Sequence, residues 1–83
     1  MKGTVTLLNR DDAMAAVETE TDEFSIIGLM SDDGLDVGDL VEGALDADGA
    51  VSLRNETRGS MIEAYVEASA VSEASAREQL DGH

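Results

Sequence analysis

Short runs of apolar and β-branched residues alternate with polar segments along the whole chain. In the last run, every second position from Ile62 to Ala68 is apolar, and the positions between them hold glutamate or tyrosine. This period of two is typical of a strand with one buried and one wet face. Six such strands at close spacing predict an all-β fold, a small antiparallel barrel of five to six strands. The runs are Gly3–Asn9, Met14–Glu20, Phe24–Met30, Leu40–Leu45, Ala50–Arg54 and Met61–Ala70.

Turn signals lie between the runs. Asn9–Asp12 and Ser31–Gly34 are polar segments that follow the first and third runs, and Asn55–Ser60 is a polar loop before the last one. Asp48-Gly49 favours a two-residue type I′ hairpin between the fourth and fifth runs, because Asp-Gly accepts the positive φ angles of that turn. The short connections are those of a meandering antiparallel sheet.

The C-terminal segment has a different pattern. Ser72–Leu80 is predicted to form a short helix, because its first residue is a favourable N-cap. The apolar face of this helix holds little more than Ala76 and Leu80, so we expect it to be weakly anchored and to fray. The expected organisation is a barrel at 1–71, followed at 72–83 by a short helix or frayed tail with a flexible C-terminus.

Charge is the strongest compositional feature. Nineteen Asp and Glu stand against five Lys and Arg, which gives a formal net charge of −14, and Lys2 is the only lysine. The excess is spread along the chain, and the pattern resembles the acidic, lysine-poor surfaces of proteins from extreme halophiles. A disordered acidic chain is disfavoured, because the apolar residues are regularly patterned. We therefore expect a small, folded, halophilic acidic protein.

Several classes of function and location are disfavoured by the sequence. No cysteine is present, so disulfides and thiolate metal sites are excluded. The apolar runs are too short for a transmembrane helix, and Met1–Thr4 lacks the apolar region of a signal peptide, so a cytoplasmic protein without a membrane partner is expected. The single histidine is His83 at the chain end, where a positioned acid–base role is not expected. The carboxylates lack EF-hand spacing. We expect no enzyme activity, no metal site and no cofactor.

The first half of the chain resembles a cold-shock domain, a small oligonucleotide-binding (OB) barrel. The shared frame is Lys2–Val5, Asn9–Asp11 and Glu18–Glu20, aligned without a gap up to Met30. Further on, Leu35–Val41 has the pattern Leu-x-x-Gly-Asp-x-Val that leads into the fourth strand of that family. The resemblance covers about half of the chain and implies an OB-like barrel that binds single-stranded RNA or DNA. The last run, from residue 61 to residue 70, lies beyond the usual end of the family.

Aromatic residues that stack on bases in cold-shock domains are absent here. The resemblance places the first-strand position on Leu7, the second-strand positions on Met14 and Ala16, and the third-strand positions on Ile26, Gly28 and Leu29. Stacking contributes about 1–3 kcal/mol per base, so its loss weakens the case for nucleic acid. The resemblance supports the fold more strongly than the ligand.

Three of the five basic residues, Arg10, Arg54 and Arg58, lie at predicted turns. Loops of an OB barrel border its ligand face, so these arginines are candidate phosphate contacts. The alternative is that turn arginines form surface ion pairs with Asp11 or Glu56, which contribute little. Another residue, Tyr65, is a candidate contact for a base or a protein, or else a side chain that caps one end of the barrel.

Two hypotheses of function follow. In the first, the chain is a non-catalytic module that associates with single-stranded RNA or DNA at high salt. In the second, it is a protein–protein adaptor or a self-associating homodimer, with an exposed aliphatic face in place of the aromatic one. The aliphatic side chains of this face could instead belong to the core, because a shift of one residue in the alternation reverses the two faces of a strand. A different small barrel, such as an Sm-like or SH3-like one, remains a third possibility. The candidate contact residues are Leu7, Arg10, Met14, Ala16, Ile26, Leu29, Arg54 and Arg58.

Overall fold

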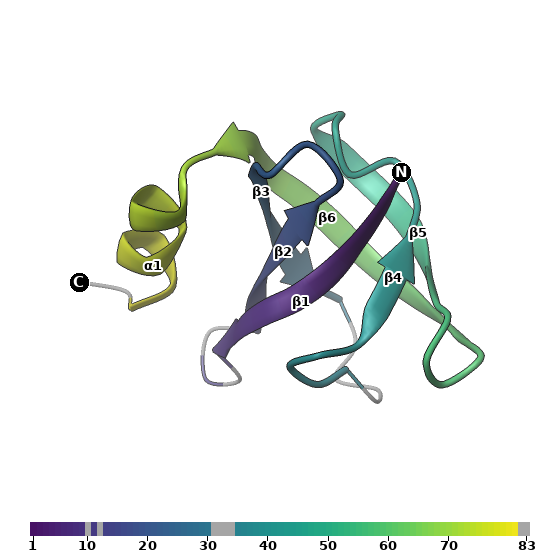
Figure 1. The fold of residues 1–83 in the computed structure, drawn as a ribbon. Helices are drawn as coiled ribbons and strands as arrows, with labels where there is room; N and C mark the ends of the chain where they lie inside the picture. The colour runs from purple at the N-terminus through teal and green to yellow at the C-terminus, as the bar shows by residue number, and fades with distance from the viewer. Residues whose placement is uncertain (10, 12, 31–34, 82–83) are drawn as a thin grey trace.

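Antiparallel strands close into a barrel, and a helix follows the last strand (Figure 1). The computed structural model describes residues 1–9, 11, 13–30 and 35–81. Within these residues six strands pair in the order β1-β2-β3-β6-β5-β4, and β4 pairs back with β1. The predicted class, a small all-β antiparallel barrel with a short C-terminal helix, is confirmed. The elements are β1 (Lys2–Asn9), β2 (Met14–Thr19), β3 (Phe24–Leu29), β4 (Leu40–Glu42), β5 (Gly49–Asn55), β6 (Ser60–Val71) and α1 (Glu73–Asp81).

The barrel interior is filled by aliphatic side chains that alternate along the strands. A shift of register in β1 decides which of its leucines belong there: β1 pairs with β2 at Val5 and again at Leu7, so Thr6 is an extra residue. Such a bulge reverses the alternation beyond it. As a result Leu8 packs against the interior, whereas Leu7 lies on the outer surface. The interior residues are Val5, Ala15, Val17, Ile27, Leu35, Val41, Leu45, Leu53, Ile62, Ala64 and Val66.

The connection between β4 and β5 differs from the predicted two-residue hairpin. Strand β4 ends at Glu42, and residues 43–48 form the connection. The physical reason is Leu45, which is fully buried in the interior cluster and whose carbonyl accepts a hydrogen bond from Ser25 Oγ (2.6 Å). Strand β4 therefore ends before Leu45, and the connection that follows directs the Leu45 side chain into the interior. Gly49, with φ of 122°, then starts β5 in a conformation that suits glycine.

Candidate functional site

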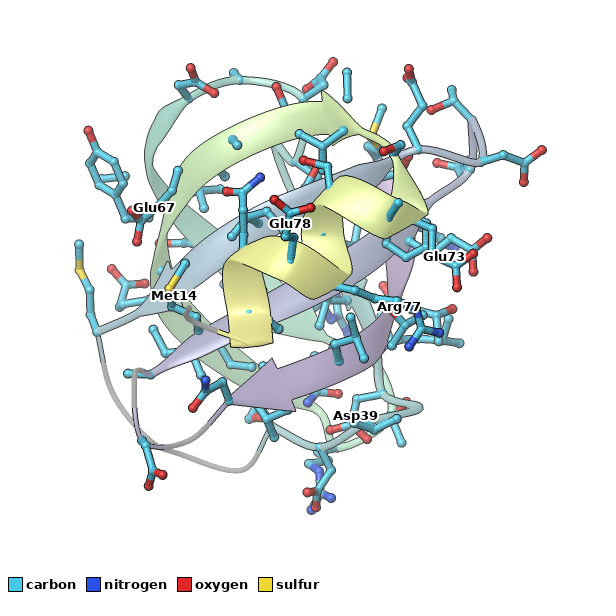
Figure 2. The ribbon with its side chains drawn as sticks, turned by 90° about the vertical axis from the view of Figure 1, so that its left-hand side faces the viewer. Met14, Asp39, Glu67, Glu73, Arg77 and Glu78 are labelled. Atoms are coloured by element: carbon cyan, nitrogen blue, oxygen red, sulfur yellow. The ribbon has the colours of Figure 1, made fainter. Side chains whose placement is uncertain are left out.

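The surface where the cold-shock resemblance places its ligand carries aliphatic side chains and one phenylalanine. Register places Leu7 opposite Ala16, and Ala16 opposite Ile26, across β1, β2 and β3. Met14 and Phe24 belong to the same cluster. We call these five residues the covered face, because helix α1 contacts all three strands and lies across them in Figure 2.

Helix α1 docks through buried side chains and through a hydrogen bond from β1. Ala76 is fully buried, Leu80 is 4% exposed, and both belong to the cluster of the covered face. Asn9 Nδ2 at the end of β1 donates to the carbonyl oxygen of Leu80 (2.6 Å). Glu73, Arg77 and Glu78, labelled in Figure 2, are exposed on the other side of the helix. The weakly anchored helix expected from the sequence is thus fixed at its C-terminal end by a residue of the first strand.

The start of α1 follows from the local sequence. Ser72 Oγ accepts a hydrogen bond from the backbone N–H of Ser75 (3.2 Å), which confirms Ser72 as the N-cap. Arg77 pairs with Glu73 at 2.9 Å, one turn apart. Ala70, with φ of 57°, occupies the left-handed region and turns the chain from β6 toward the helix.

The candidate contact residues of the aliphatic face differ in accessibility. Ala16 and Ile26 have no exposed surface, while Leu7 and Met14 are half-buried beside them. Leu29 packs against the barrel interior and is not part of this cluster. The expectation of an exposed aliphatic face is therefore wrong at Ala16 and Ile26, because α1 covers them, and at Leu29, because its side chain packs against the interior.

Arg58 is held by two carboxylates. Its Nε donates to Asp39 Oδ2 (2.8 Å), and a terminal nitrogen donates to Asp36 Oδ2 (2.8 Å). The same oxygen of Asp39 also accepts hydrogen bonds from Asn55 Nδ2 (2.9 Å) and from the backbone N–H of Asp36 (3.0 Å). This network ties the segment before β4 to the loop between β5 and β6.

The network also sets the ionisation of its buried carboxylate. Burial raises the pKa of Asp39, but hydrogen bonds from Asn55, Arg58 and the backbone of Asp36 outweigh it and hold the pKa below the usual 3.8. The hydrogen bond to Asp39 in turn raises the pKa of the Arg58 guanidinium. Asp39 is therefore charged at neutral pH, and Arg58 is its counter-ion.

The three turn arginines thus have different positions. Arg58 forms the ion pair that the alternative hypothesis expected, with Asp36 and Asp39 as partners in place of Asp11 or Glu56. Arg54 is exposed on the outer side of β5, opposite Met61 of β6. Arg10 lies outside the described residues.

A second outer surface carries large apolar side chains that α1 does not cover. Met61 is 61% exposed and Tyr65 is 47% exposed, both on the outer side of β6. Met30, 61% exposed, follows β3, and its backbone N–H donates to the carbonyl of Glu63 (3.1 Å). We call the surface formed by Met30, Met61, Glu63, Tyr65 and Glu67 the bare face.

The cross-strand partners of Tyr65 on both neighbouring strands are small residues. Tyr65 pairs with Gly28 of β3 on one side and with Ala50 of β5 on the other. Directly opposite residues on one face of a sheet are the closest cross-strand neighbours. The directly opposite residues on both neighbouring strands are therefore small. Tyr65 lies within the strand on its outer side, so it does not cap a barrel end.

Two glutamates flank the ring along β6. Ser52 Oγ donates to Glu63 Oε2 (2.6 Å), which holds that carboxylate on the face. A Cβ atom placed on Gly28 would lie 2.7 Å from Glu67 Oε2, so the Glu67 carboxylate occupies the space over the glycine. Figure 2 shows Glu67 at the rim of the barrel, away from the helix. The period-two pattern of the last run marked the polar side of this strand, but gave no reason to group it with Met30.

A groove of about 280 Å³ opens near the start of β1. It is lined by Lys2 together with Glu18, Glu20 and Asp22, among others. The backbone N–H of Lys2 donates to Glu20 Oε1 (2.8 Å), so part of this polar lining is already paired. Among the described residues, no group of three His, Cys, Asp or Glu side chains could hold a metal ion. No helix in the described ranges is long and apolar enough to cross a membrane.

No protein-family model matches this sequence, and comparisons with curated proteins and with solved structures gave no match. The geometry of the two faces is therefore the basis for a functional proposal.

Proposed function

We propose that this protein is a non-catalytic binding module that takes a protein partner on the bare face. The observation that carries the proposal is the exposure of Met30, Met61 and Tyr65 on one side of the barrel. Large apolar side chains exposed among polar residues on one surface are typical of protein contacts. Methionine adapts its shape to a partner, and tyrosine combines an apolar ring with a polar tip. This retains the adaptor hypothesis and moves it to another surface.

Single-stranded nucleic acid is supported less well by the geometry. Nucleic-acid affinity depends on cations that neutralise phosphates. Arg58 and Arg77 are each paired with carboxylates, and Lys2 lies among acidic residues. The face expected to stack bases lies under α1. Among the described residues, Arg54 and Tyr65 are the remaining contacts for a nucleic acid, and they would bind a polyanion weakly when the chain carries a net charge of −14.

Self-association through the bare face is also disfavoured. A symmetric dimer would bring Glu63 and Glu67 of two copies close together. Like charges at short distance oppose association, and the net charge of −14 adds repulsion between whole molecules. We therefore propose a partner other than a second copy.

The test uses a photo-crosslinker at Met61, in the form of p-benzoylphenylalanine. The matched control carries it at Val37, which is 59% exposed but lies before β4, outside the bare face. We expect a light-dependent protein adduct from position 61 that is lost when Tyr65→Ser and Met30→Ser are added, and no such adduct from position 37. Equal adducts from both positions, or none from position 61, would contradict the proposal. An adduct removed by nuclease would favour nucleic acid instead.

A further inference from the structure

We infer that the occupant of the bare face is a basic polypeptide segment, with an arginine or lysine side chain lying on the Tyr65 ring between Glu63 and Glu67. The inference rests on the proposed function and adds the chemistry of the partner. The negative charge of the face and the accessible aromatic ring both favour arginine or lysine side chains in the partner.

Accessibility of the ring is the first step. Tyr65 is 47% exposed and its neighbour on β5 is Ala50, so a partner side chain can approach the ring from the β5 side, while the Glu67 carboxylate lies over Gly28 on the other side. A cation over an aromatic face is attracted by the ring quadrupole, and arginine also stacks its planar guanidinium on the ring. An aliphatic residue at this position would offer apolar area without that attraction.

Placement of the carboxylates is the second step. Glu63 and Glu67 lie two residues before and after Tyr65, and both are exposed on the outer side of β6. The Glu67 carboxylate lies over Gly28, and Ser52 holds Glu63 on the face. A cation on the ring would therefore be flanked by two negative charges. A partner carboxylate at the same point would be repelled by both.

Polarity along the face is the third step. Arg54 lies opposite Met61, so the end of the face near Met61 carries a positive charge. The acidic part of the face is the part around Tyr65. A bound segment should place its basic residues against Tyr65 and its apolar or acidic residues near Met61.

The chain supplies its own probe for this site. Tyr65 is the only tyrosine, and there is no tryptophan, so tyrosine fluorescence reports on the bare face alone. The ligand in the experiment is hexa-arginine peptide, with hexa-lysine and hexa-glutamine peptides for comparison. Titrations are made at about 0.1 M and about 1 M KCl, where the Debye length falls from about 10 Å to about 3 Å.

We expect hexa-arginine to change the tyrosine signal saturably, hexa-lysine to bind more weakly, and hexa-glutamine to give no change. The double variant Glu63→Gln/Glu67→Gln should weaken binding of hexa-arginine about fivefold to tenfold at the lower salt concentration. The matched control Glu18→Gln/Glu78→Gln removes two exposed carboxylates away from the bare face. It should change the affinity by less than about twofold. Circular dichroism checks that both variants keep the barrel.

The remaining outcomes distinguish a failure of the inference from a failure of the proposed function. Equal loss of affinity in both double variants would show general attraction to an acidic surface and would overturn the inference. Equal binding of hexa-glutamine would overturn it too, since charge would then be irrelevant. If hexa-arginine does not bind while position 61 still crosslinks to a protein, the inference fails and the proposed function stands. If neither is observed, both fail.

Discussion

On the covered face, aliphatic side chains of β1, β2 and β3 lie under α1, whereas on the bare face Met30, Met61 and Tyr65 remain exposed to solvent. Both are outer surfaces of the same barrel, and Met30 of the bare face directly follows β3, which contributes Phe24 and Ile26 to the covered face. The difference shows that an apolar outer surface can complete the fold or can remain available to another molecule. The two faces differ in that α1 packs on the covered face.

The covered face is the larger hydrophobic contribution to the fold. Phe24 and Ile26 are buried there with Ala76 and Leu80 of the helix. Full burial of a side chain of the size of Phe or Ile contributes about 1.5–3 kcal/mol. On the bare face, Met30 and Met61 are each 61% exposed, so their burial contributes less to the stability of the fold. The two faces therefore respond differently to substitution.

The largest effect on stability is expected from truncating Leu80, which docks α1 on the covered face. Leu80→Ala should lower the free energy of unfolding by about 2–4 kcal/mol, because it deletes a buried side chain and leaves a cavity beside Ile26. Urea unfolding followed by circular dichroism measures this. Gln79→Ala, one residue earlier and exposed, is the control, with an expected change within about 0.5 kcal/mol. Equal effects of the two changes would mean that α1 does not depend on docking.

Asp39 lies on neither face, and its substitution tests the hydrogen-bond network that it forms with Asn55 and Arg58. Asp39→Asn should cost about 1–3 kcal/mol, since the donors on Asn55 and Arg58 lose a charged acceptor. Because the folded state lowers the pKa of Asp39, its contribution is complete above the unfolded pKa and is lost as the pH falls through the folded value.

The pH dependence gives this prediction its control. The difference in unfolding free energy between wild type and Asp39→Asn should be constant near neutral pH and should narrow below about pH 4. Denaturant unfolding at a series of pH values measures the difference. A gap that stays constant down to the acid limit would show that the charge of Asp39 is not what stabilises the network.

A smaller effect on stability is expected at the N-terminus of α1. Ser72→Ala removes the N-cap of α1 and should cost about 1 kcal/mol, visible as faster amide hydrogen exchange in the first turn of the helix. Ser72→Asp keeps an acceptor at this position and should restore protection. Failure of the aspartate to restore it would argue against the capping role.

The smallest effect on stability is expected on the bare face. Met30→Ser, Met61→Ser and Tyr65→Ser should each change the free energy of unfolding by no more than about 0.5 kcal/mol, because these side chains are exposed. The Met30 and Tyr65 changes should nevertheless remove the crosslinked adduct. If any of the three destabilised the barrel as strongly as Leu80→Ala, the bare face would be part of the core and the comparison of the faces would fail.

Much of the fold could be read from local patterns. The period of two from Ile62 to Ala68, within the predicted run Met61–Ala70, and the serine before α1 depend only on residues close together in the sequence, and both predictions were confirmed. The candidate site was less accessible to such reasoning. Side chains at Ala16 and Ile26 have the residue types of either a binding face or a core, and nothing near them in sequence distinguishes the two.

The sequence by itself determined the barrel class, the start of the helix and the strands apart from the end of β4, because these depend on short-range alternation and capping. Tertiary structure alone decided that α1 lies on the covered face, that Leu7 points outward after the bulge at Thr6, and that Arg58 pairs with Asp39. Each of these depends on contacts between distant parts of the chain. The bond from Asn9 to Leu80 joins residues 71 positions apart, and only the closed barrel brings them together.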